Sequence, residues 1–216
     1  MIEKLSHFPV NWIDGMSINK THFTAVQNFV SDSVRDAVGV HTSMIGYGLL
    51  PVQNSIKINL IIDNHKLLRI KVEECHAVTP NGSRIEIGGE LTENLSLSIP
   101  YLEAVKELKE NQEAVLLACI SVNPFKRTPY GEPDPEENPP RYPYTLPEYS
   151  LNLIPEDELK NTIGFGGNYL TIGKILVHSG ESRIDDNYIP PCVSVSSHQK
   201  LQELYTEIDR FYGQIE

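Results

Sequence analysis

Residues 67–83 read LLRIKVEECHAVTPNGS and carry the strongest indication of the fold. Leu68, Ile70 and Val72 alternate with charged residues, a period of two that is typical of a strand with one buried face. Asn81-Gly82 then joins this run to a second β-capable run, and this residue pair is the strongest short-range signal for a β-hairpin. The stretch therefore predicts an antiparallel β domain built outward from this hairpin.

Other segments extend the β domain and flank it with helices. Apolar residues at steps of three and four predict an amphipathic helix over 21–38, with Asn19 or Thr21 as its N-cap and Gly39 at its end. A last helix is expected from about Ser197. The remaining expected elements are strands at 56–62, 67–78, 95–99, 114–122, 169–178 and 188–195 and a short helical stretch at 101–110.

The segment 124–147 differs from the rest, since it holds 8 of the 15 prolines. Proline cannot pair in a central strand or sit inside a helix, so we expect a long excursion, extended and partly polyproline II. One interpretation is a disordered acidic surface loop. Its tyrosines favour the other, an arm that lies on another surface such as a neighbouring subunit.

Composition excludes several classes of function. The chain has 216 residues and a net charge of −11, which disfavours binding to nucleic acids and to anionic membranes. It has no run of about 18 apolar residues, so we expect no membrane insertion, and no secretory signal begins the sequence. Cys75, Cys119 and Cys192 lie far apart, so we expect buried free thiols and a cytoplasmic location.

Motifs for catalysis or metal binding are missing from the sequence. It has no HxxxH or HExxH spacing, no GxSxG, no P-loop and no GxGxxG. The glycine-rich run 164–167 lacks the residues of a phosphate site and is expected to be a turn. Glu74 and His76 share a strand face, where a cross-strand network is favoured over a pH-sensitive pair. We therefore expect no enzyme, no metal and no cofactor.

The last helix carries apolar residues at a spacing of 3-4-3-4, as in a coiled-coil seam: Leu201, Leu204, Ile208, Phe211 and Ile215. This seam fits either packing on the chain's own β domain or self-association. Because the sequence stops inside the pattern, we expect the front part of a longer protein.

Four stretches together are similar to the TssK family of type VI secretion baseplate proteins. The sequence VNWIDGM (10–16), followed by His22-Phe23, resembles the family's V-x-W-x-x-G-M opening and its His-Phe entry into a helix. GYGL (46–49) resembles an aromatic-Gly-Leu strand start, and AVTPNGS (77–83) resembles a G-x-x-P-D-G-[ST] hairpin. IGKI (172–175) with IDDNYIPPC (184–192) resembles the family's segment before its middle helices.

This resemblance implies a fold and a role. The implied fold is an antiparallel β-sandwich like the shoulder domain of phage receptor-binding proteins, with an N-terminal helix and a C-terminal helix that begins a bundle. Residues 1–193 would form this shell and 194–216 the start of a helical middle domain. The implied assembly is a homotrimer that links the TssF–TssG wedge to the membrane complex, with the shell facing the wedge at the inner face of the envelope.

Site residues follow from the same comparison. Trp12, Met16 and Phe23 are expected to bind a partner, although Trp12 would equally serve as a lid over the shell's own core. Gly15 is expected to hold a positive φ and His22 to bond a neighbouring backbone group. The other motif positions are expected to be structural: Pro80, Asn81, Gly82, Asp185, Pro190 and Pro191.

Two other functions fit these residues. One is the shoulder domain of a phage tail receptor-binding protein, with the same fold in a different machine. The other is a carbohydrate-binding β-sandwich that stacks sugars on Trp12 and the tyrosines of 130–149.

Overall fold

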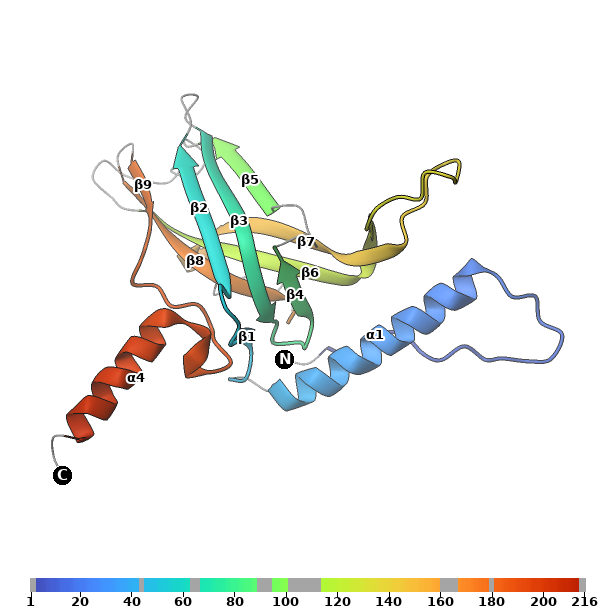
Figure 1. The fold of residues 1–216 in the computed structure, drawn as a ribbon, viewed down its shortest axis with the longest axis horizontal. Helices are drawn as coiled ribbons and strands as arrows, with labels where there is room; N and C mark the ends of the chain where they lie inside the picture. The colour runs from blue at the N-terminus through green and yellow to red at the C-terminus, as the bar shows by residue number, and fades with distance from the viewer. Residues whose placement is uncertain are drawn as a thin grey trace.

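Two antiparallel sheets pack against each other in the computed structural model, with one helix at each end of the chain (Figure 1). The described residues are 3–42, 45–62, 67–88, 95–100, 114–159, 167–178 and 181–213. Among them, no helix combines the length and the apolarity that crossing a bilayer requires. The mainly β, two-sheet fold class is therefore as predicted.

β3 (Leu67–Val78) is the central strand of the first sheet and pairs with each of its other four strands. One edge of β3 pairs with β2 (Ile56–Ile62) and then with β1 (Gly48–Leu49). Its other edge pairs with β5 (Leu95–Pro100) and then with β4 (Arg84–Ile87). The predicted bounds of β2 and β3 are confirmed, since alternation of apolar and polar residues specifies the buried face over most of each strand.

The second sheet has the order β7-β6-β8-β9. Its strands are β6 (Ala114–Tyr130), β7 (Tyr144–Pro155), β8 (Tyr169–His178) and β9 (Glu181–Ile184), with the one-turn helix α3 (Glu156–Leu159) after β7. Side chains of both sheets meet in one core, which includes Leu68, Ile70, Ile120, Leu170 and Ile172. Burial of these side chains is the main favourable contribution to folding.

The proline-rich segment forms an arm that projects from the second sheet (Figure 1). β6 continues through Pro124 to Tyr130 and pairs with β7 as far as the Tyr130–Tyr144 pair. Because β8 pairs with β6 only up to Ser121, the outer half of this ribbon is two-stranded and accommodates proline. The projecting proline-rich segment was predicted, but the pairing of its first and last residues as strands β6 and β7 was not.

One expectation about the C-terminal half was wrong, and one strand there was not predicted. Residues 188–195 form no strand, because Pro190 and Pro191 have no N–H to donate and only Cys192 makes a bridge, to Leu49. The strand after β8 is instead β9, a short polar segment that sequence periodicity does not reveal. The expected helix at 101–110 lies outside the described residues.

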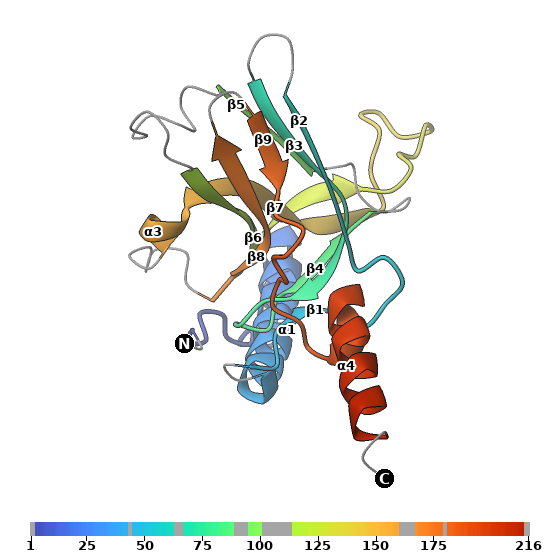
Figure 2. The same ribbon diagram turned by 90° about the vertical axis from the view of Figure 1, so that its left-hand side faces the viewer.

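The two helices leave the shell in different directions (Figures 1 and 2). Helix α1 (Lys20–Thr42) lies beneath the sheets, while α4 (Gln199–Tyr212) follows the 3-10 turn η2 (Val195–Ser197) and points away. Helix α1 does not end at Gly39, as expected, but continues to Thr42. Gly39 instead provides space, because a Cβ there would lie 3.0 Å from the backbone oxygen of Asn81.

Candidate functional site

Large exposed apolar side chains gather on the N-terminal lead (residues 3–19), on α1 and on α4. The helix stripe that gave α1 its periodicity faces outward, with exposed fractions of 61% for Phe23, 51% for Val30 and 57% for Val34. The face of α1 that is buried carries Asp32, Arg35 and Gly39 instead. Exposed apolar surface of this kind is common at protein-binding sites, so the outer face of α1 is a candidate one.

The lead carries the predicted partner-binding tryptophan. Trp12 is 50% exposed, and its ring centroid lies 6.0 Å from that of His22 in the first turn of α1. Gly15 has a φ of +78° and turns the chain, and Met16 is half-buried. Trp12 is thus placed beside the start of α1 with half of its surface free.

Helix α1 begins with a reciprocal cap. The Asn19 side-chain oxygen accepts the Thr21 backbone N–H at 3.0 Å, and the His22 Nδ1 accepts the Asn19 backbone N–H at 3.2 Å. This arrangement is a capping box in which histidine takes the place of the usual glutamate. The cap holds the His22 ring next to Trp12.

A buried polar cluster ties the lead and α1 to the hairpin. Asp32 is fully buried and accepts two hydrogen bonds from the Arg35 guanidinium, at 2.7 and 2.9 Å. It also accepts the backbone N–H groups of Ser6 and His7, at 2.7 and 2.9 Å. Burial alone would raise the pKa of Asp32, but these donors together lower it to about 2.

Asn81 connects this cluster to both sheets. Its Oδ1 accepts from Arg35 Nη1 at 2.5 Å and from the Glu3 backbone N–H at 3.0 Å, and its Nδ2 donates to Asn168 at 3.1 Å. The Asn81 side chain is fully buried, so every one of these bonds replaces one to water. The strongest β-turn pair in the sequence is therefore also the docking point for α1.

Close backbone contact makes Gly82 essential at this point. Gly82 has a φ of +87°, and a Cβ there would lie 2.3 Å from the Arg35 carbonyl oxygen and 2.7 Å from the Gly39 nitrogen. Pro80, half-buried, precedes this contact in the loop between β3 and β4. The hairpin turn and the helix thus touch backbone to backbone.

The C-terminal motif guides the chain from β9 to α4. Asp185 forms a turn in which its side chain accepts the Asn187 N–H at 2.9 Å. The Pro191 carbonyl accepts the Leu49 N–H at 2.7 Å, and a Cβ at Gly48 would lie 2.0 Å from that same oxygen. Pro190 is buried beside it. This segment therefore crosses β1 closely before α4 begins.

Helix α4 touches the shell only near its start. Its predicted seam residues Leu204, Ile208 and Phe211 are exposed by 50%, 47% and 60%, and Leu201 is half-buried. Ile215 lies outside the described residues. The seam does not pack on the chain's own sheets, so the interpretation as an intramolecular contact fails for these positions.

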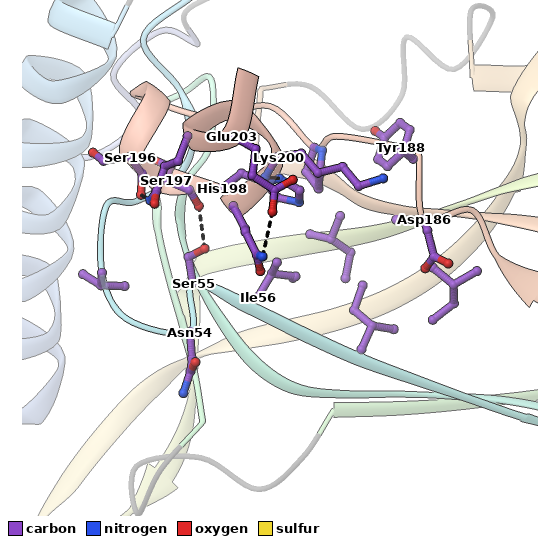
Figure 3. Close-up of a pocket in the computed structure, with 18 of the residues that line it drawn as sticks. Asn54, Ser55, Ile56, Asp186, Tyr188, Ser196, Ser197, His198, Lys200 and Glu203 are labelled. Atoms are coloured by element: carbon purple, nitrogen blue, oxygen red, sulfur yellow. Dashed lines mark hydrogen bonds between the residues drawn. The ribbon is translucent and has the colours of Figure 1, made fainter. Parts of the chain in front are cut away.

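A hollow of about 860 Å³ lies at the joint between the shell and α4 (Figure 3). The Ser55 hydroxyl donates to the Ser197 carbonyl at 2.7 Å across this joint, and Lys200 donates to Asn187 at 3.2 Å. The His198 ring caps α4 by accepting the Lys200 N–H. These bonds hold the start of α4 against the shell, and Lys200 is the charged residue of the hollow that takes part in them.

No cluster of catalytic groups emerges elsewhere in the described part of the chain. His76 contacts Glu86 on β4 at 2.5 Å, a cross-strand contact, rather than acting with Glu74. Burial raises the pKa of Cys75 and of Cys119 to about 12, and Cys192 is half-buried. Among the described residues, no three His, Cys, Asp or Glu side chains are grouped as metal ligands.

Sequence reasoning missed Asp32 and Arg35. Their signal was present, since positions 32, 35 and 39 share one helix face at steps of three and four. The apolar stripe on the opposite side concealed it. Only the docking of the hairpin shows that a polar face can be the buried one.

The sequence and the fold were compared with those of known proteins. No family model matches the sequence, and no curated protein matches it. A crystal structure of TssK has a TM-score of 0.53 and 16% identity, covering 92% of this chain and 45% of that one. A structure of the type VI secretion baseplate complex has a TM-score of 0.52 and 14% identity, covering 94% of this chain and 65% of that one.

A cryo-electron microscopy structure of the TssK–TssF–TssG baseplate subcomplex gives a TM-score of 0.57 and 12% identity, over 94% of this chain and 68% of that one. The chain spans less than half of the TssK crystal chain and about two thirds of the other two. At these identities the likeness establishes the fold. This chain has a TssK-like fold.

Proposed function

We propose that this protein is a structural adaptor of a type VI secretion baseplate, a TssK-like subunit whose shell docks a TssF–TssG wedge. The observation that carries the proposal is the shared fold with a TssK structure and with a chain of a TssK–TssF–TssG subcomplex. The exposed apolar surfaces of the lead, α1 and α4 support it, because an adaptor works through protein interfaces.

Self-association is the second part of the proposal. We place the shell in residues 1–193 and the start of a helical middle domain in 194–216, with Leu201, Leu204, Ile208, Phe211 and Ile215 in the seam of a homotrimer. About half of the surface of Leu204, Ile208 and Phe211 has no intramolecular partner, which favours a helix bundle between copies.

The remaining roles follow from these two parts. Trp12, Met16 and Phe23 would contribute to partner binding, and the protein would work without catalysis. In the assembled machine it would connect the baseplate to the membrane complex from the cytoplasmic side of the envelope. The acidic surface fits protein partners rather than nucleic acid.

The test is co-purification with TssF and TssG proteins from the organism that encodes this chain. The chain carries an affinity tag, and retention of both wedge proteins through a salt wash is the expected result. A TssF–TssG pair from an unrelated secretion system serves as the control and should not be retained. Loss of the cognate wedge from a folded sample would overturn the proposal.

A further inference from the structure

A groove of about 390 Å³ lies between α1 and the base of the arm. Its lining comes from α1, β6, β7 and the β3–β4 turn, and includes Arg35 and Arg84. Six of the lining side chains are aliphatic or prolyl: Val30, Val34, Val122, Pro124, Leu146 and Pro147. The outward stripe of α1 forms one wall, and the paired part of β6 and β7 forms the other. The groove is open to an apolar segment of another chain.

Arg127 brings an unbalanced positive charge to this groove. Its Nη1 donates to Gln27 at 3.0 Å, and its Nη2 donates to Asn28 at 2.9 Å and to Ser31 at 3.5 Å. All three acceptors are neutral, and its Nε is buried without an acceptor. Among described residues, no carboxylate lies within ion-pair distance of it, so a carboxylate arriving in the groove would be favoured.

The lead carries a segment of complementary chemistry. Trp12 and Ile13 are exposed by 50% and 63%, and Asp14, which follows them, is also exposed. Within the described part of the chain, the Asp14 carboxylate makes neither a hydrogen bond nor an ion pair. The segment thus offers two apolar side chains and one free negative charge.

In the conformation observed, residues 12–14 do not line the groove of their own chain. The His7 ring stacks on Phe125 at a centroid distance of 4.0 Å, beside the groove, and the lead then runs out past the start of α1 (Figure 1). Trp12 lies next to His22, whereas the α1 residues that line the groove run from Val30 to Arg35, about 12–20 Å further along the helix axis. The segment is therefore held at the N-terminal end of α1, outside the groove.

We propose that residues 12–14 of one copy occupy the α1–arm groove of a neighbouring copy. Ile13 packs on Val30 and Val34 of that neighbour, and Asp14 pairs with its Arg127. Each groove is filled only by a second chain. Every interface therefore joins the lead of one copy to the groove of the next, head to tail. This inference rests on the proposed self-association and adds the contact that holds neighbouring shells together.

Mixed disulfide formation tests the contact directly. One chain with a large tag carries Ile13→Cys and a second untagged chain carries Val34→Cys, both in a Cys192→Ser background that leaves only the buried thiols. Mild oxidation of the mixture should give one cross-linked product that contains both chains. A chain with Ile13→Cys mixed with a chain carrying Thr206→Cys on α4 serves as the control and should give none. Failure of the Ile13–Val34 product in folded samples overturns the inference.

A charge exchange tests the ion pair. Asp14→Arg and Arg127→Asp should each raise the dissociation constant of self-association about tenfold, and the double variant should recover most of the loss. Arg141→Asp is the matched control, since Arg141 lies at the tip of the arm and pairs with Glu137. Equal loss in the double and single variants would contradict the pairing.

The two proposals fail separately. Retention of the wedge by a chain that forms no mixed disulfide would leave the adaptor function standing and remove the groove contact. Mixed disulfides in a chain that never binds the wedge would support the groove contact and remove the adaptor function. A chain that is monomeric by light scattering up to high concentration overturns the groove contact.

Discussion

The Arg35 guanidinium on α1 donates a 2.5 Å hydrogen bond to Oδ1 of Asn81, a residue 46 positions later in the β3–β4 turn. Both side chains are buried, and Arg35 is held in turn by Asp32. The pair therefore couples the orientation of the helix to the first sheet. Because the lead is bonded to Asp32 and to Asn81, its position depends on the same contact.

Replacing Asn81 should loosen this coupling. Asn81→Ala leaves the Arg35 Nη1 and the Glu3 N–H without an acceptor, and we expect a loss of about 2 kcal/mol in the free energy of unfolding. Asn81→Asp should cost less, since a carboxylate still accepts both bonds and faces a cation. Urea denaturation measures both. Equal losses for the two variants would argue against an acceptor role.

Stability should fall in acid because of Asp32. Its pKa in the folded state is about 2, below the ordinary value of 3.8, so the folded state favours the charged carboxylate. The resulting contribution of about 2 kcal/mol is complete above pH 4 and is lost as the pH falls toward 2. An NMR titration of the Asp32 carboxyl carbon checks the pKa directly. A midpoint near 4 would contradict the prediction.

Two glycines with positive φ separate backbone strain from close packing. Gly15→Ala should cost about 1 kcal/mol, because its φ is +78° but nothing lies within 4 Å of the added Cβ. Gly82→Ala has a similar φ and adds a clash with the backbone of α1, so we expect about 3 kcal/mol or more. Thermal and urea unfolding measure the difference. Equal costs would mean that α1 moves away easily.

The seam of α4 should affect assembly and not folding. Ile208→Lys places a charge in the proposed bundle and should abolish the trimer in light scattering, with unfolding of the shell changed by less than about 0.5 kcal/mol. Thr206→Lys adds the same charge on another face of α4 and should leave the molar mass unchanged. A trimer that survives Ile208→Lys would place the self-association elsewhere.

The elements that sequence predicts well are those set by local period. β2, β3 and β8 have their expected bounds because alternation of apolar and polar residues specifies which side of a strand is buried. The Asn81-Gly82 turn follows for the same reason, since a positive φ at Gly82 is a local requirement. The resemblance of motifs in order along the chain also led to the correct fold.

The elements that sequence predicts poorly depend on contacts between distant segments. Gly39 is suited by local rules to end a helix, yet it lies inside α1 where the Asn81 backbone needs room. Prolines in 124–130 argue against pairing, yet the strand continues because its outer half has a free edge. In each case a neighbour that is remote in sequence overrides the local preference.

The sequence by itself determined most of the strands, the hairpin and the two amphipathic helices, because these follow from side-chain periodicity and turn chemistry within a few residues. Only the tertiary structure decided which face of α1 is buried and where the lead lies. The burial of Asp32 and Arg35 becomes favourable only when Asn81 and the lead's backbone N–H groups supply their hydrogen bonds. That requirement turns the apolar stripe outward.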